Sequence, residues 1–233
     1  MRTPLRLGYW AAQLSAAFAL LWFITFNMQD ILSPVPAWQD LNAYAQAYSP
    51  LRLLYIYPSL LLPLTFIALF VCIHRLAPEH KKAWSQTGLA IGVVYAAMAT
   101  INYNIQAVAV RQSLASGETT GVAMFIPDNP HSVFAALANS YVYMSIAMAC
   151  TGMVFDGSGL QRGIRWCFLA QIVTAVGQIG FSMFGVPMPV FIVTSMVWVV
   201  GAPLGFVLLA ALFRRNAWPP CGETPVTGGT TAR

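Results

Sequence analysis

The sequence predicts an all-α integral membrane protein, a polytopic bundle of six transmembrane helices with both termini in the cytoplasm. Two observations lead to this fold class: six long apolar stretches, and a Lys and Arg content that alternates between the connections joining them. Hydrophobic residues make up 58% of the chain and charged residues only 8%, whereas soluble domains carry about 25% charged residues. So few charges exclude a water-soluble surface.

Each apolar stretch is close to the ~20 residues that cross ~30 Å of hydrocarbon as a helix. The stretches are 9–27, 52–73, 86–109, 134–155, 166–185 and 190–213, and none has an Asp, Glu, Lys or Arg beyond its ends. The first follows a basic segment, as a secretory signal does, but it is long and lacks a small-residue cleavage pattern, so we expect a retained helix. One membrane domain over 1–217 therefore uses most of the chain, and we expect 218–233, with its Pro, Gly and Thr, to be a disordered cytoplasmic tail.

The basic residues set the predicted orientation. Ten of them fall in the N-terminal segment, the second and fourth connections and the C-terminal segment: Arg2, Arg6, Arg75, Lys81, Lys82, Arg162, Arg165, Arg214, Arg215 and Arg233. Only Arg52 and Arg111 remain for the other side. By the positive-inside rule both termini are cytoplasmic, in a bacterial-type inner membrane. Because the net charge of +5 is not gathered into one aromatic-rich patch, no nucleic-acid partner is expected.

Two external connections are long, 30–51 and 110–133. In the first, Trp38, Leu41, Ala45 and Tyr48 recur at helical spacing, which predicts a short helix at the membrane interface. The second is expected to be an ordered loop folded over the mouth of the bundle. Residues 24–29 and 101–106 resemble each other near the outer ends of their helices, which leaves open a duplicated two-helix hairpin.

Polar side chains inside the apolar stretches are the main candidates for a site, because an unpartnered polar group facing lipid is unfavourable. We expect them to form a polar seam that opens outward; its members are Asn27, Asn102, Gln106, Asn139, Tyr143, Gln171 and Gln178. Amides and hydroxyls orient a polar molecule but do not supply the proton transfers of a pump. The seam therefore predicts binding or passage of a small neutral or amphiphilic molecule through the bilayer. The alternative is interhelical hydrogen bonding that fixes the helix register.

Two further hypotheses stay open. One is a membrane enzyme acting on a lipid or isoprenoid at an interface, with Glu118, Asp128 and His131 on the outer side or His74, Glu79 and His80 on the inner side. No nucleophile motif or glycine-rich phosphate loop supports catalysis. The four cysteines have no paired spacing, so we expect no metal and no cofactor.

The other hypothesis is an accessory subunit, or a homo-oligomer, joined through small-residue faces. Small residues four positions apart let helix backbones approach closely. The pairs are Ala12 and Ala16, Gly88 and Gly92, and Gly201 and Gly205.

Overall fold

The computed structural model describes residues 3–34 and 38–215, and every regular element within these ranges is a helix. The elements are α1 (Thr3–Leu32), α2 (Leu41–Ala47), η1 (Pro50–Leu53), α3 (Ile56–Leu76), η2 (Glu79–Lys81), α4 (Lys82–Asn104), η3 (Ile105–Val110), α5 (Arg111–Ser116), η4 (Val122–Phe125), α6 (Val133–Ala138), α7 (Ser140–Gly152), α8 (Leu160–Leu169), α9 (Gln171–Phe184) and α10 (Met188–Arg214). The expected tail, 218–233, lies outside the described residues.

These elements join into six spans long and apolar enough to cross a membrane, as predicted. The spans are Thr3–Leu32, Pro50–Leu76, Glu79–Ser116, Val133–Gly152, Leu160–Phe184 and Met188–Arg214. Each is longer than, or shifted from, its apolar stretch, because a helix continues into its flanking polar turns. Two spans are each divided into two helices by a single residue, Asn139 in the fourth span and Ala170 in the fifth.

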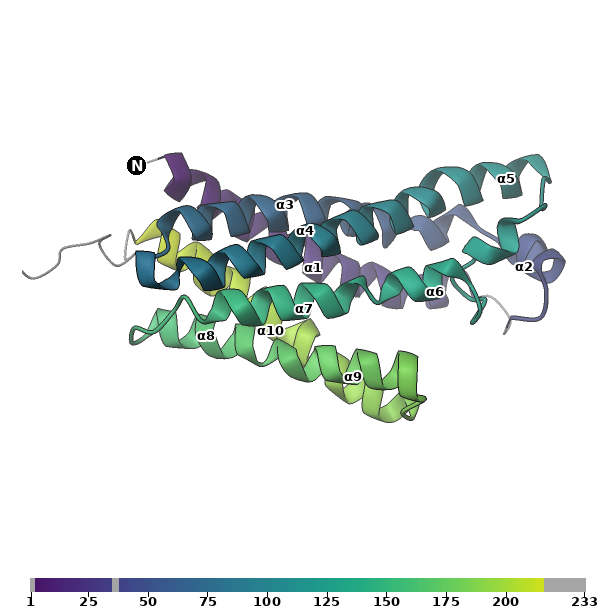
Figure 1. Ribbon diagram of the computed structural model, residues 1–233. Coiled ribbons are helices and arrows are strands. Elements are labelled where there is room, and N and C mark those ends of the chain that lie inside the picture. The colour runs from purple at the N-terminus through teal and green to yellow at the C-terminus, as the bar shows by residue number, and fades with distance from the viewer. Residues whose placement is uncertain (1–2, 35–37, 216–233) are drawn as a thin grey trace, which may run out of the picture.

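The spans form a closed ring. α1 packs against α3 and α10, α4 packs against α3 and α7, and the α8–α9 span lies against both α7 and α10. Thr3, the α3–α4 turn, the α7–α8 connection and the end of α10 share one end of the bundle, which we call the terminal end (Figure 1). The opposite end, which carries α2 and α5, is called the loop end.

Aromatic side chains fill the interior of the helix bundle near its middle. The Phe66 and Phe70 rings are stacked with centroids 4.0 Å apart, and Phe66 meets the edges of Tyr95 and Phe206. All four side chains are at most 1% exposed. Buried aromatics at these distances stabilise the bundle beyond the area they bury.

The small-residue faces are used within the ring. A Cβ added at Gly88 would lie 2.2 Å from Thr151 Oγ1 and 2.9 Å from the Ala147 carbonyl oxygen, so α4 and α7 touch there. Gly205 similarly faces the Phe168 ring. These glycines therefore set distances between helices of one chain.

The two long connections fold together into a cap over the loop end. Asp40 begins α2 by accepting a hydrogen bond from the Ala43 amide at 2.8 Å, which confirms a short helix there. α2 does not lie alone at an interface: its buried Tyr44 packs with Val122 and Ile126 of the second connection, in a small apolar cluster separate from the main core. This cap positions the polar groups described next.

Candidate functional site

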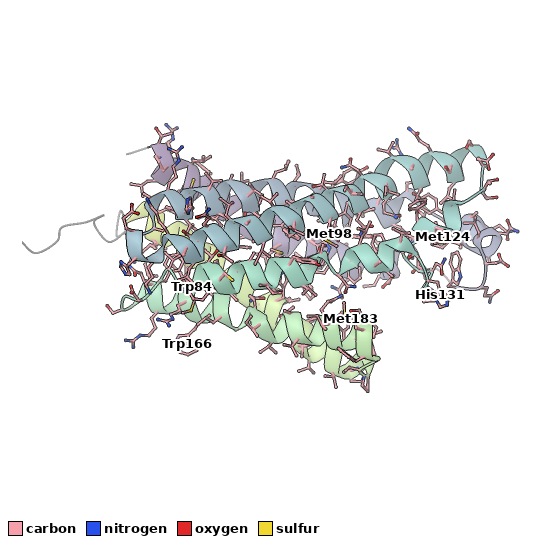
Figure 2. All side chains as sticks on the ribbon, in the orientation of Figure 1. Trp84, Met98, Met124, His131, Trp166 and Met183 are labelled. Carbon is pink, nitrogen blue, oxygen red and sulfur yellow. The ribbon has the colours of Figure 1, made fainter. Side chains whose placement is uncertain are left out.

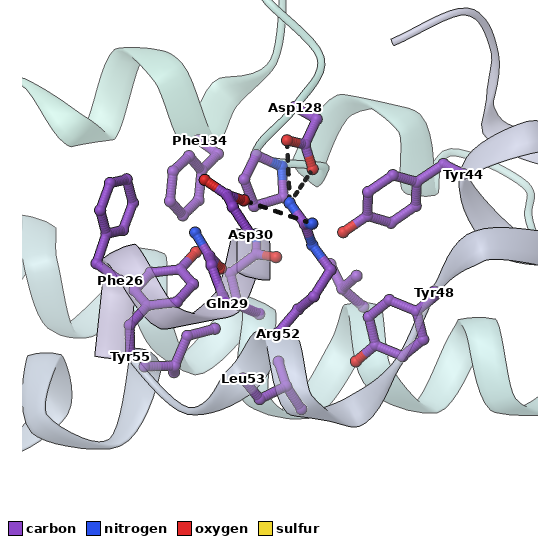
Figure 3. A pocket seen from close by; sticks show the side chains of 14 residues that line it. Phe26, Gln29, Asp30, Tyr44, Tyr48, Arg52, Leu53, Tyr55, Asp128 and Phe134 are labelled. Carbon is purple, nitrogen blue, oxygen red and sulfur yellow. Dashed lines mark hydrogen bonds and ion pairs between the residues drawn. The ribbon is translucent and has the colours of Figure 1, made fainter. Parts of the chain in front are cut away.

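A pocket of about 210 Å³ lies between the cap and the helix ends (Figure 3). Its wall combines charged, amide, phenol and apolar side chains from α1, the cap, η1, the start of α3, η3 and α6. The lining residues are Phe26, Gln29, Asp30, Tyr44, Tyr48, Arg52, Leu53, Tyr55, Ile56, Gln106, Val110, Pro127, Asp128 and Phe134. All walls come from one chain.

Arg52 organises the pocket. Its side chain is 8% exposed, and its Nη2 donates to both carboxylate oxygens of Asp128 at 3.0 and 3.1 Å. Nη1 donates to the Ser33 carbonyl oxygen at 3.0 Å and lies 3.8 Å from the Asp30 carboxylate. One guanidinium thus ties the end of α1, the start of the second span and the second connection together, as the dashed lines in Figure 3 show.

Burial shapes the acid–base properties of the cap. Burial raises the pKa of Asp128, and the nearby Asp30 charge adds to this, while the Arg52 guanidinium opposes it. Burial is also the main cause that raises the pKa values of the Tyr44 and Tyr48 phenols. Both phenols therefore stay neutral around pH 7 and act as hydrogen-bonding groups with intact aromatic faces.

Aromatic rings close the floor of the pocket toward the bundle interior. Tyr55 meets Phe26 edge to face with centroids 5.5 Å apart, and meets Tyr103 at 6.2 Å. The Tyr103 hydroxyl then shares a 3.0 Å hydrogen bond with that of Tyr141, which packs on Trp198. Tyr55 and Tyr103 are at most 5% exposed, so packed aromatic side chains lie between the pocket and the bundle interior.

The structure brings one predicted seam residue to the pocket. Gln106 is buried, lines the cavity and donates from Nε2 to the Phe125 carbonyl oxygen. Asn102, one turn earlier, is also buried. Asn27 and Tyr143, in contrast, are exposed on helix surfaces, and Asn27 bonds only to its own helix through the Phe23 carbonyl.

The other three seam residues lie at or near helix interruptions. Gln171 is fully buried at the α8–α9 break, where its Nε2 donates to the Cys167 carbonyl of the same span at 3.0 Å and to the Val197 carbonyl of α10 at 3.5 Å. Asn139 separates α6 from α7, and its Oδ1 accepts a 3.5 Å bond from Gln178. These contacts are of the kind expected for side chains that fix helix register.

The three outer titratable candidates do not come together in one site, because their hydrogen-bonding partners differ. Asp128 is bound to Arg52, whereas the Glu118 carboxylate accepts from the Thr120 amide in its own loop, which holds the pKa of Glu118 below its usual value. His131 is exposed, near the loop end in Figure 2.

On the terminal end, the three inner candidates are also divided. His74 Nδ1 lies 2.9 Å from Ser85 Oγ, Glu79 pairs with Lys82, and His80 is exposed. No group of three or more His, Cys, Asp or Glu side chains that could hold a metal occurs among the described residues.

Sequence reasoning missed the centre of the pocket. Arg52 was noted only as one of two basic residues on the side that is poor in them, and Tyr44 and Tyr55 were not singled out. The available signal was a basic residue at the very start of an apolar stretch, with four acids on the same side, Asp30, Asp40, Glu118 and Asp128. No protein-family model, curated protein or solved structure matches the chain.

Proposed function

We propose that the chain spans a bacterial-type cytoplasmic membrane six times, with the terminal end in the cytoplasm. The described basic side chains support this orientation. At the terminal end lie Arg6, Arg75, Lys81, Lys82, Arg162, Arg165, Arg214 and Arg215, whereas the loop end has Arg52 and Arg111. Cytoplasmic segments carry such an excess of Lys and Arg.

The exposed tryptophans indicate how deep the pocket lies. Trp84 and Trp166 are 45% and 65% exposed toward the terminal end (Figure 2), as side chains in the headgroup region are. Gln106 follows Trp84 by 22 residues, which at ~1.5 Å per residue is about 33 Å along the helix. That distance matches the hydrocarbon thickness of ~30 Å. The pocket therefore lies at the outer headgroup level, open to molecules from the water phase.

The function supported best is binding of a small polar or amphiphilic molecule in this pocket. The observation that carries it is the Gln29 amide, which lines the cavity and makes no side-chain hydrogen bond to the described residues, although the residue is only 6% exposed. A ligand in the cavity supplies hydrogen-bonding partners for this amide. The aromatic floor favours binding over passage through the bundle.

A size-matched pair of variants tests this function. Val110 is 2% exposed and lines the pocket, so Val110→Phe fills it, whereas Val108→Phe on the same segment adds the same ring at a 49% exposed position. The purified protein is heated with a panel of small cations, anions and neutral molecules. We expect at least one class to raise the melting temperature of the wild type and of Val108→Phe, but not of Val110→Phe. The proposal is contradicted if a compound stabilises both variants alike. It is also contradicted if no class of compound stabilises the wild type or either variant.

A further inference from the structure

The charges in the pocket wall do not cancel. Asp30 and Asp128 contribute two carboxylates and Arg52 one guanidinium, which leaves one negative charge in excess. Arg111 lies near Tyr48, but its side chain is exposed and is not part of the wall. A ligand with one positive charge would neutralise the site.

The Arg52 charge is already paired within the chain. Its Nη2 donates to both Asp128 oxygens, and its Nη1 donates to the Ser33 carbonyl. Asp30 is held less tightly: its carboxylate is 69% exposed, forms a 3.8 Å ion pair with Nη1, and accepts no hydrogen bond from the described residues. The Asp30 carboxylate therefore remains able to accept a hydrogen bond from a positively charged ligand.

Aromatic rings lie on both sides of Arg52, and the Asp30 carboxylate lies on the side of Phe26, Tyr55 and Phe134 (Figure 3). Figure 3 shows Tyr44 and Tyr48 on one side of Arg52, with Phe26, Tyr55 and Phe134 toward the other. The negative face of an aromatic ring attracts organic cations, and cages of several rings bind quaternary ammonium groups. Phenols are neutral at pH 7, so the faces of these rings remain available for that contact.

The unpartnered amide completes the site. Gln29 carries a carbonyl oxygen and an amide NH₂, so it can accept from or donate to a hydroxyl on the ligand. In Figure 3 its amide group lies beside Asp30 and Tyr55. Tyr48 adds a buried polar atom, a hydroxyl without a hydrogen-bonding partner among the described residues.

We infer that the pocket binds a small organic monocation, an alkylammonium or quaternary ammonium compound with one hydrogen-bonding group. The inference rests on the proposed function and adds the class of ligand. The cavity of about 210 Å³ equals the liquid volume of about seven waters at ~30 Å³ each. That is the size of choline. In this arrangement Asp30 and the aromatic rings contact the cationic head of choline, and Gln29 hydrogen bonds to its hydroxyl.

Three probes of similar size separate charge from shape. Calorimetric titrations of the detergent-purified full chain use choline, the neutral alcohol in which carbon replaces the nitrogen, and the anion pivalate. We expect choline to bind at least about tenfold more tightly than the neutral alcohol, since desolvated cation–π contacts contribute up to ~2 kcal/mol. We expect no binding of pivalate.

Two substitutions assign the contacts. Asp30→Asn keeps the shape of the exposed side chain but removes its charge, and we expect choline affinity to fall about fivefold, as for a partly solvated ion pair. Tyr48→Phe keeps the ring and is expected to retain binding, whereas Tyr48→Leu removes the ring and weakens it about threefold or more. Circular dichroism and gel filtration confirm that each variant is folded.

The outcomes separate this inference from the proposed function. If the neutral alcohol or pivalate binds as tightly as choline, and Val110→Phe abolishes that binding, the pocket is a binding site but its ligand is not a cation. If none of the three probes binds, the cation inference is overturned, and the wider panel alone decides the proposed function. Choline binding unchanged in Asp30→Asn and Tyr48→Leu also overturns the inference, because the ligand then lies elsewhere.

Discussion

Replacing Arg52 by methionine removes the one side chain that joins α1, the second span and the second connection. The change deletes two hydrogen bonds to Asp128 and one to the Ser33 carbonyl, and it keeps the apolar stem. It also leaves the Asp128 carboxylate without a counter-charge. Removing one partner of a fully buried ion pair destabilises a protein by about 3–5 kcal/mol.

The expected loss is smaller here, because the two partners are not buried alike. The Arg52 side chain is 8% exposed, but that of Asp128 is 32% exposed and will be partly hydrated once its partner is gone. We therefore expect Arg52→Met to lower the free energy of unfolding by about 2–3 kcal/mol. Asp128→Asn, which keeps one hydrogen-bond acceptor, is expected to have a smaller effect.

The assay is unfolding of the purified protein by increasing SDS in mild detergent, followed by circular dichroism. Lys82→Met is the matched control, because it breaks an ion pair whose partners are 41% and 86% exposed and should change stability by about 0.5 kcal/mol. The double variant of Arg52 and Asp128 completes a cycle and should give a coupling energy above about 1 kcal/mol. If Arg52→Met is no more destabilising than Lys82→Met, the guanidinium does not hold the cap and the argument for a preformed pocket fails.

Three further results are expected. Gly88→Ala should destabilise the protein by about 2 kcal/mol in the same SDS titration, since its Cβ would clash with the Ala147 carbonyl; an unchanged midpoint would show that α4 and α7 are not in close contact. Because burial raises the pKa of Asp128, the folded state holds its proton more tightly, so the free energy of unfolding should fall as pH rises from the usual aspartate value of about 3.9 through the raised pKa. Melting curves of Asp128→Asn should lack that slope, and an equal slope in the variant would assign it to another group. In a chain whose native cysteines are replaced by serine, a membrane-impermeant maleimide should label Glu118→Cys in intact cells but Glu79→Cys only after permeabilisation; the reverse pattern contradicts the proposed orientation.

Much of the fold could be predicted from hydropathy, but the helix ends could not. The third apolar stretch was drawn at 86–109, whereas the span runs over Glu79–Ser116. Hydropathy marks where a helix leaves the hydrocarbon. The helix can continue beyond that point, because its backbone hydrogen bonds are also satisfied outside the membrane. The division of two spans was not predicted for a related reason: at Asn139 and beside Gln171, one polar side chain lowers the average hydropathy of a span too little to mark the break.

The candidate site was predicted in pieces that belonged to separate hypotheses. Gln106 was assigned to a polar seam and Asp128 to an interfacial enzyme, and the structure places both in one pocket wall. Sequence spacing relates residues of one helix, but this pocket depends on the packing of two long connections against each other through Tyr44 and Ile126. That contact is tertiary, so Arg52 could be recognised only as a basic residue on an unexpected side.

Native mass spectrometry of the freshly purified chain tests most directly whether the pocket is a binding site. Wild type, Val110→Phe and Val108→Phe are released from the same detergent under the same conditions. We predict that the wild type and Val108→Phe carry a small adduct of the same mass, which is absent from Val110→Phe. An adduct retained by Val110→Phe, or no adduct on any of the three, would contradict the account.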